Sequence, residues 1–390
     1  MPLRSTRAAY RSDHDMSVED GIRVHALIDS LTVGGAEMLL AEFAPVARAA
    51  GVELSVGYLS GDEGSPAAMR LRAAGVEPQL VPLGSLKDPS ALPRVRHHIA
   101  GIGPDLVHTH LEYADLVGGL AARSLRIPAV STLHAAEWPT RGRAGARSRL
   151  AAVVRRRCAR RVIAVSESAR TSYLATGRDV SERVVTVHNG ITGRAEPGAG
   201  RTVRAELGLE PDGLVVAVVA ALRPEKGHEV AAAACLQLAG RFPALRLVVV
   251  GDGDHRASVD RALAPLGPRA VRTGYRDDVM AVLDACDVVL APSYTDAFPT
   301  ALIEAMAASV PVVATAVGGV AEIVEDGVTG LLVAPPPQAE RVAETLAAAL
   351  EHAALRHRLG QAGLERFERA FSPVRWAEET RRVYEAVLGR

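Results

Sequence analysis

Two carboxylates stand in an unusual setting in the stretch TDAFPTALIEAM, residues 295–306. Asp296 precedes a Phe-Pro pair, and Glu304 follows among Ala, Leu, Ile and Met residues. A proline costs no hydrogen bond at the first turn of a helix, so the pattern predicts a helix that begins near Phe298–Thr300. The free amides and the positive dipole end of that helix would bind an anion such as a diphosphate.

Glu304 lies about one turn inside the expected helix, where a carboxylate among apolar neighbours needs hydrogen-bond donors. A ribose whose diphosphate lies on the helix end would supply two hydroxyls. Asp296 would then reach the hydroxyls of a group attached to that diphosphate. An acid satisfied by nearby backbone or by an arginine is the structural alternative, and the residues alone leave both interpretations open.

Two further groups suit the same anion. In VAALRPEKGHEV, residues 219–230, Arg223 offers a planar fork of donors and Lys226 a point charge, although both could be solvated charges in a turn. In SLTVGGAEMLL, residues 30–40, a glycine pair would let the backbone approach a phosphate ahead of a helix, unless it only forms a tight turn. That pair is Gly34 and Gly35.

Three histidines stand near the ends of expected strands in the first half. His134 ends the expected strand in STLHAAEW, residues 131–138, and DLVHTH contains His108 and His110. No third ligand or metal-type spacing accompanies His108 and His110, so we interpret these two as cleft-lining residues on the acceptor side and expect no metal. VVVGDGDHR, residues 248–256, lacks the third glycine of a dinucleotide fingerprint, which makes an NAD-dependent oxidoreductase a distant alternative and leaves no cofactor indicated.

Short apolar runs alternate with longer helical patterns throughout the chain. The expected strands are 23–29, 54–59, 105–110, 128–134, 161–166 and 184–189 in one set, and 214–220, 245–252, 270–275, 288–293, 311–316 and 329–335 in a second set. Such an alternation predicts α/β architecture with two Rossmann-like domains whose parallel sheets face each other across a cleft. Ligands bind at the carboxyl ends of such strands.

The domain limits follow from composition. We expect a disordered extension over 1–20, an acceptor-binding domain over 21–192, a donor-binding domain over 193–370, and a final helix over 371–390 that returns to the first domain. The extension has no apolar segment typical of a secretory signal. The longest apolar run, 213–222, is well below the ~20 residues of a membrane span. The expected location is the cytoplasm.

Composition excludes several classes of protein. Of the 390 residues, 48% are hydrophobic and 23% charged, as in ordinary globular chains. Lys+Arg and Asp+Glu both number 45, so no nucleic-acid partner is indicated. Three widely spaced cysteines, Cys158, Cys235 and Cys286, argue against a disulfide framework and a zinc cluster.

The segment TDAFPTALIEAMAASVPVVATAVGGVAEIVEDGVTGLLV resembles the signature of retaining GT-B glycosyltransferases of family 4. It contains two acids flanking a Phe-Pro turn, then a Pro-Val-Val strand and a Gly-Gly loop. The first acid departs from the pattern, because Asp296 and Ala297 stand where the family usually has Glu and Gly. The resemblance extends from residue 22 to the C-terminus and is strongest over 219–335.

The resemblance implies a role for each matched position. Glu304 would hold the nucleotide ribose and Asp296 the transferred sugar, while Arg223 and Lys226 would neutralise the diphosphate. His134 would face the donor sugar near the reacting carbon. The expected donor is a UDP-sugar, bound without a metal, and the sugar would pass to a hydroxyl with retention. The amides around Phe298, Pro299, Thr300 and Ala301 would cradle the diphosphate and sugar, with Tyr275 and Arg276 beside the nucleobase.

The acceptor stays open at this point. A small sugar, a cyclitol, a glycan or a secondary metabolite is one expectation, and Glu112, Asp115 and Glu137 would receive a cationic acceptor. The segment 141–161 carries nine arginines and no acid, so a weak association with the inner membrane face and a lipid-linked acceptor form an alternative to a solvated basic helix. A nucleotide-sugar epimerase and a non-catalytic nucleotide-binding protein are the rival functions.

Overall fold

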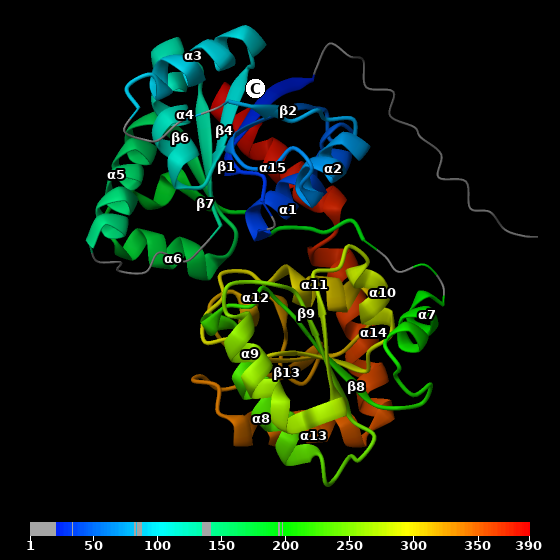
Figure 1. Ribbon diagram of the computed structural model, residues 1–390. Helices are drawn as coiled ribbons and strands as arrows, with labels where there is room; N and C mark the ends of the chain where they lie inside the picture. Colours follow the sequence, from blue (N-terminus) through cyan, green and yellow to red (C-terminus); the bar gives the residue numbers. More distant parts are fainter. Residues whose placement is uncertain are drawn as a thin grey trace, which may run out of the picture.

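The computed structural model describes residues 21–32, 34–81, 83, 88–134, 142–193, 196 and 198–390, with the backbone alone over 142–146. The expected disorder over 1–20 lies outside these residues. Within them the chain forms two parallel sheets, of seven and six strands, which lie one above the other in Figure 1. The first has β1 (Ile22–Ser30), β2 (Val52–Ser60), β3 (Gln79–Leu80), β4 (Leu106–His110), β5 (Ala129–Leu133), β6 (Ala159–Ala164) and β7 (Val184–Thr186). The second has β8 (Val215–Val219), β9 (Arg246–Val250), β10 (Ala270–Gly274), β11 (Val288–Ala291), β12 (Val312–Thr315) and β13 (Gly330–Val333).

Helices cover both faces of the first sheet, whose strand order is β3-β2-β1-β4-β5-β6-β7. They are α1 (Gly35–Ala47), α2 (Pro66–Ala73), α3 (Ala91–Ile102), α4 (Glu112–Leu125), α5 (Gly142–Cys158) and α6 (Glu167–Ala175). One cluster of buried side chains joins β1 and β2 to α1 and α2, and another joins β1 and β4 to α3 and α4. The order reverses between β1 and β4, so the loops after these two strands lie side by side.

The second sheet repeats the arrangement in the order β10-β9-β8-β11-β12-β13. Its helices are α7 (Ala199–Glu206), α8 (His228–Leu238), α9 (Arg256–Leu263), α10 (Val279–Asp284), α11 (Thr300–Ala307), α12 (Val320–Ile323), α13 (Ala339–Glu351) and α14 (Ala353–Ala370). Short 3-10 turns are η2 (Ser181–Arg183), η3 (Pro224–Lys226) and η4 (Ala264–Arg269). Here the order reverses between β8 and β11, which makes the loops after these strands the expected ligand site.

The strands read as continuous apolar runs because both faces of each sheet are covered. In β8, Val216 and Val218 pack against α8, α9 and α13, whereas Val215 packs against α7 and α10 on the opposite face. The predicted α/β fold with two Rossmann-like domains is therefore confirmed. Each of the twelve expected strand ranges overlaps an observed strand, and only the exposed, two-residue β3 was not predicted.

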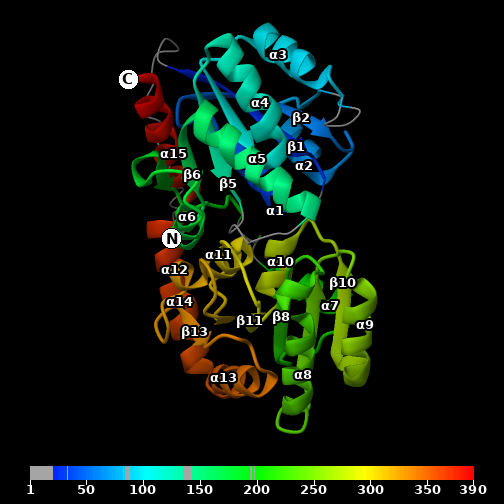
Figure 2. The ribbon, with the colours of Figure 1, turned by 90° about the vertical axis from the view of Figure 1, so that its left-hand side faces the viewer.

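The last helix, α15 (Pro373–Leu388), leaves the second domain and packs on the first sheet. Figure 2 shows α14 beside the second sheet and α15 continuing from it along the first. Trp376 meets Phe43 of α1 edge to face at 5.0 Å, and the Tyr384 hydroxyl lies 2.8 Å from His108 Nδ1. These contacts make α15 part of the core that holds β1 and β4.

One hydrophobic cluster is continuous between the two domains. It contains Tyr173 of α6 and Val162 of β6 from the first domain, and Phe298 and Leu302 from the second.

Among the helices of the described residues, none combines the length and apolar character that crossing a membrane requires.

The buried histidine of β1 leads to a testable prediction on stability. His25 Nδ1 lies 3.0 Å from Ser55 Oγ, and burial, with the nearby His98 as a second cause, lowers the pKa of His25 to about 3. The unfolded chain binds a proton near pH 6.5 and the native chain does not. The free energy of unfolding should therefore fall as pH drops from 6.5 toward 3, by about 1.4 kcal/mol per pH unit for this residue.

Urea unfolding followed by circular dichroism between pH 7.5 and 4.5 measures this dependence. His25→Gln should make the dependence shallower by one proton, while the same change at the exposed His357 should not alter it. Equal pH dependence in His25→Gln and the unmodified chain would contradict the assignment.

Candidate active site

The point where the second sheet reverses brings together cations and a carboxylate that are far apart in the sequence. β8 and β11 pair in parallel, with Val289 opposite Ala217, so their following loops are neighbours. Lys226, at the end of η3, places its Nζ 2.5 Å from Asp296 Oδ2 in the loop after β11. The two side chains are 21% and 11% exposed, so this ion pair is only partly screened by water.

Gly227 lets η3 approach the loop after β11. Its φ is +67°, and a Cβ on it would lie 2.0 Å from the carbonyl oxygen of Pro292. The Tyr294 amide also donates to the Glu225 carbonyl over 2.8 Å. The Lys-Gly pair of the sequence therefore combines a cation with the one residue type that fits this contact.

The Gly-Gly pair after β12 holds the other side of the same loop. Gly318 has φ +53°, and a Cβ on it would lie 1.7 Å from the Asp296 carbonyl oxygen. The Gly319 amide donates to that oxygen over 3.1 Å, and a Cβ on Gly319 would lie 2.2 Å from the Ala297 carbonyl oxygen. We name residues 292–299 the donor loop, after the role that the sequence predicts for Asp296 and its neighbours.

α11 explains why Glu304 stands among apolar residues. The helix begins at Thr300 with Pro299 at the N-cap, and no side chain caps its N-terminus. Its buried face consists of Leu302, Ile303, Ala305, Met306 and Ala307. Glu304 is half-buried on another face, and no hydrogen bond joins its carboxylate to the described residues. Burial raises the pKa of Glu304 to about 7, with Glu42 adding to the effect and Arg70 opposing it.

The other residues expected to bind the donor differ in how firmly neighbouring carboxylates hold their side chains. Arg223 is 63% exposed on its side chain, and its closest carboxylate, Glu225, is 4.0 Å away. Arg276, by contrast, is held by Glu206 and Asp278 over 2.6–3.0 Å. The Tyr275 hydroxyl donates to Asp277 over 2.8 Å. Arg223 can therefore turn toward a ligand, whereas Tyr275 and Arg276 would have to exchange partners.

Phe298 has a packing role within the donor loop. Its ring stacks on His188 at 5.0 Å with an interplanar angle of 3°, and it meets Phe371 edge to face. Its neighbours Ala301 and Thr300 are half-buried at the start of α11.

The first domain places its candidate residues at the reversal between β1 and β4. Gly34 is the N-cap of α1 with extended backbone, and open space surrounds the position that a Cβ on Gly35 would take. Asp29, at the end of β1, accepts the amides of Tyr113 and Ala114 over 3.1 and 2.6 Å. Burial outweighs these bonds and raises the pKa of Asp29 to about 7. The sequence analysis did not single out Asp29, although a strand-end acid was a usable signal.

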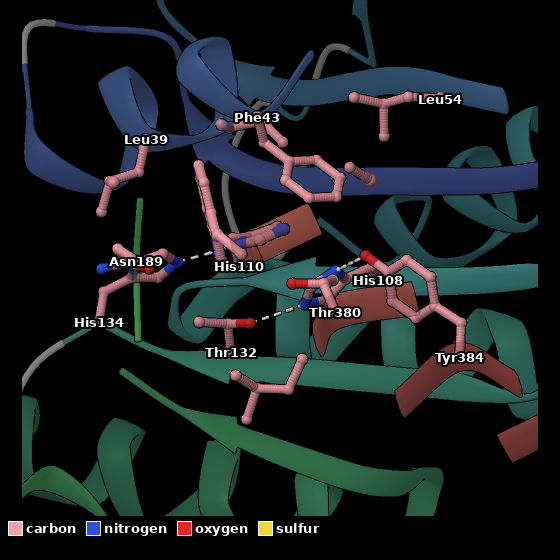
Figure 3. A pocket seen from close by; sticks show the side chains of 14 residues that line it. Leu39, Phe43, Leu54, His108, His110, Thr132, His134, Asn189, Thr380 and Tyr384 are labelled. Atoms are coloured by element: carbon pink, nitrogen blue, oxygen red, sulfur yellow. Dashed lines mark hydrogen bonds between the residues drawn. The ribbon is translucent and has the colours of Figure 1, made fainter. Parts of the chain in front are cut away.

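The three histidines come together beside a cavity of about 30 Å³ under α1 and α15, shown in Figure 3. His110 Nδ1 lies 2.9 Å from His134 Nε2, and His108 lies between Thr132 and Tyr384. Burial lowers the pKa of His108 to about 3 and of His134 to about 4, and it holds the pKa of His110 well below its usual value. All three are therefore neutral at pH 7.

Two ring nitrogens of this cluster have no hydrogen-bond partner among the described residues. They are His110 Nε2 and His134 Nδ1, and both are buried. The residue after His110, Leu111, has φ +74°, which is a strained conformation for leucine. In the described part of the chain, no cluster of His, Cys, Asp or Glu has metal-binding geometry.

The acids expected on the acceptor side are already paired or undescribed. Glu112 Oε2 accepts from Arg147 Nε over 2.5 Å, and Arg147 also bonds the Tyr113 hydroxyl. Asp115 is fully buried against Arg155, with Nη2 and Oδ2 2.7 Å apart. Glu137 lies outside the described residues. A cationic acceptor therefore has no unpaired carboxylate among the described members of this group.

The basic helix α5 has two different faces. Val154 packs on Leu116 of α4, with Cys158 beside it, so these two apolar side chains are not available to a membrane. Leu150 and Val153 are 55% and 41% exposed. Of the apolar side chains at Leu150, Val154 and Cys158, the last two are therefore covered by α4.

A contact between the domains, and its extension within the first domain, were not anticipated. Arg70 of α2 bonds the Asp277 carbonyl over 3.2 Å and Glu42 over 2.9 Å. Glu42 in turn accepts the Thr192 amide over 3.0 Å. No local pattern signals such pairs, because they depend on how the two domains meet.

The close approach at Gly318 can be tested with a matched control. Gly318→Ala should displace the donor loop, because its Cβ meets backbone. Gly327 also has positive φ, +71°, but open space around its Cβ position, so Gly327→Ala should cost only about 1–2 kcal/mol of strain. Melting temperatures and hydrogen exchange over 292–299 measure the difference. Equal losses and unchanged exchange in the two variants would contradict the assigned contact.

The sequence matches known families over most of its length. The family described as "Glycosyl transferases group 1" matches residues 201–366, and the one described as "Glycosyltransferase Family 4" matches residues 33–192. A protein named D-inositol 3-phosphate glycosyltransferase, from Mycobacterium leprae (strain Br4923), is 34% identical over 253 residues, which cover 59% of this chain and 56% of that protein. The protein of the same name from Nocardia farcinica (strain IFM 10152) is 32% identical over 312 residues, which cover 73% and 67%. The chain thus spans little more than half the length of the M. leprae relative.

A solved structure shares the fold. HepE of Anabaena in complex with UDP-glucose superposes with a TM-score of 0.83 at 24% identity, and the alignment covers 94% of this chain and 100% of that one. This likeness supports the two-domain GT-B architecture. Together with the matches to both halves of the sequence, it shows that the chain belongs to the group 1 glycosyl transferases of glycosyltransferase family 4.

Proposed function

We propose that this chain transfers a sugar from a nucleoside diphosphate sugar to a hydroxyl group, with retention at the anomeric carbon. The observation that carries the proposal is the Lys226–Asp296 pair beside the uncapped start of α11, with Glu304 one turn further along. A cation, free helix amides and a half-buried carboxylate fit a diphosphate followed by a ribose. HepE was solved with UDP-glucose, and this supports a UDP-sugar as donor.

In this proposal different residues bind the diphosphate and the sugar of the donor. Lys226 and the exposed Arg223 bind the diphosphate and stabilise the charge that develops as it leaves. When the diphosphate replaces Asp296 as the partner of Lys226, the Asp296 carboxylate becomes free. It then accepts hydrogen bonds from hydroxyl groups of the transferred sugar. The leaving diphosphate takes the acceptor proton on the same face, and no protein nucleophile takes part. The two cations and the helix dipole supply the positive charge, so the proposed transfer needs no metal.

The acceptor lies on the first domain in this proposal. His110 Nε2 and His134 Nδ1 have no hydrogen-bond partner in the part of the chain that the structure describes, and neutral rings suit hydroxyl groups. The relatives named for D-inositol 3-phosphate favour a phosphorylated cyclitol over a lipid-linked acceptor. The pairing of Glu112 with Arg147 gives no support to an amine-bearing acceptor.

A panel of nucleoside diphosphates tests the donor. The melting temperature of the full chain is measured with UDP, GDP, dTDP and ADP, each with and without EDTA. A ligand at 100 times its Kd adds about 2.7 kcal/mol, so UDP should raise the melting temperature and EDTA should not change the shift. No shift with any diphosphate would overturn the proposal, and a shift abolished by EDTA would overturn its metal-free form.

We predict that the Glu304 carboxyl group releases a proton when the nucleotide binds. Its pKa is about 7 without ligand, and ribose hydroxyls donating to the carboxylate favour the ionised form. UDP affinity should therefore fall by up to about tenfold per pH unit as pH drops below 7. Titration calorimetry in buffers of different ionisation enthalpy measures the proton.

Glu304→Gln is the matched control for this proton. It removes the titrating group but leaves the protonation of the diphosphate itself unchanged, so the difference between the two proteins belongs to Glu304. An identical pH dependence of affinity in both proteins would contradict the proposed ribose contact.

A further inference from the structure

The start of α6, in the first domain, touches the donor loop of the second. Ser166 Oγ donates to the Ala297 carbonyl oxygen over 2.7 Å and accepts the Ala169 amide over 3.0 Å. The same hydroxyl therefore caps α6 and bonds the loop that carries Asp296. A Cβ on Gly319 would lie 3.0 Å from Ser166 Cβ, so the contact has no room to spare.

Glu322, in the second domain, caps the same helix from the other side. Its two carboxylate oxygens accept the amides of Glu167 and Ser168 over 2.7 and 2.8 Å. His188 Nε2 donates to it over 2.9 Å. Burial alone would raise the pKa of Glu322, but these hydrogen bonds outweigh burial and hold the pKa below its usual value. The carboxylate is thus a strong acceptor at the positive end of α6.

His188 connects this cap back to the donor loop. Its ring stacks on Phe298 while its Nε2 bonds Glu322. Three consecutive loop residues are therefore held from both domains. The Asp296 carbonyl oxygen accepts the Gly319 amide of the second domain. The Ala297 carbonyl oxygen accepts the Ser166 hydroxyl, and Phe298 stacks on His188, both of the first domain. We name Ser166, His188 and Glu322 the α6 joint.

We propose that the α6 joint couples the donor loop to the first domain, which makes its three members positioning residues for sugar transfer. The inference rests on the proposed function, because it assigns the loop to donor binding. The second domain holds the loop by itself through Gly318, Gly319 and η3, so nucleotide binding does not require the joint. The joint matters for the transfer step, because that step requires the two domains to hold donor and acceptor in a fixed relative position.

Hydrogen exchange with UDP as probe tests the coupling without an identified acceptor. In the unmodified full chain, UDP should slow exchange in the donor loop and also at the first amides of α6. In Glu322→Gln and Ser166→Ala, UDP should still protect the loop while α6 no longer responds. UDP affinity should stay within about threefold. If the unmodified chain turns over UDP-glucose with D-inositol 3-phosphate, that turnover should fall at least tenfold in both variants.

Ser65→Ala is the matched control, because Ser65 caps α2 by accepting the Ala68 amide over 3.2 Å, and within the described residues no hydrogen bond joins Ser65 itself to the second domain. It should lose a helix cap and keep the response of α6 to UDP. An α6 response that is absent in the unmodified chain, or unchanged in Glu322→Gln and Ser166→Ala, would overturn the joint.

Failure of the proposed function gives a different result. In that case no nucleoside diphosphate protects the donor loop in the unmodified chain. The joint is then judged in the same samples without ligand, where faster α6 exchange in Glu322→Gln but not in Ser65→Ala supports the contact between domains. Unchanged exchange would overturn it.

Discussion

The candidate site depends on backbone contacts that are shorter than any side chain would permit. The donor loop lies between Gly227 on one side and the pair Gly318 and Gly319 on the other, and each glycine faces a carbonyl oxygen of the loop. These contacts fix where Asp296 lies relative to Lys226. The cation and the carboxylate come from different strands, so their distance is set by backbone packing and not by the flexible side chains alone.

The two domains carry different chemistry at the same edge of their sheets. The second domain offers charge, through Lys226, Arg223 and the amides of α11. The first offers neutral polar groups, because burial keeps its histidines uncharged and Arg155 compensates Asp115. A charged half, and a neutral half whose ring nitrogens lack partners among the described residues, suit two ligands of different kinds, which agrees with membership in a transferase family.

The sequence was sufficient for those features that depend on local periodicity. The buried strands read as apolar runs since both faces of each sheet are covered, and the start of α11 follows from its Phe-Pro turn. The two-residue β3 has no periodicity, so it could not be predicted. Pairs such as Glu112 with Arg147 were also beyond reach, because a run of arginines does not indicate which of them turns inward. Glu322 was visible after the Gly-Gly pair, but its partners lie in the other domain.

The path of α15 affects how the chain can fold during synthesis. Its Trp376, Ala377, Tyr384 and Val387 pack with Ile22 and Val24 of the first strand. A ribosome makes the first sheet early, but the helix that completes its core leaves the exit tunnel only after the whole second domain. Domains usually fold as units from the N-terminus onward as they emerge. Here part of the apolar surface of the first domain stays uncovered until α15 has been made. The nascent chain would therefore need a chaperone more than the finished protein.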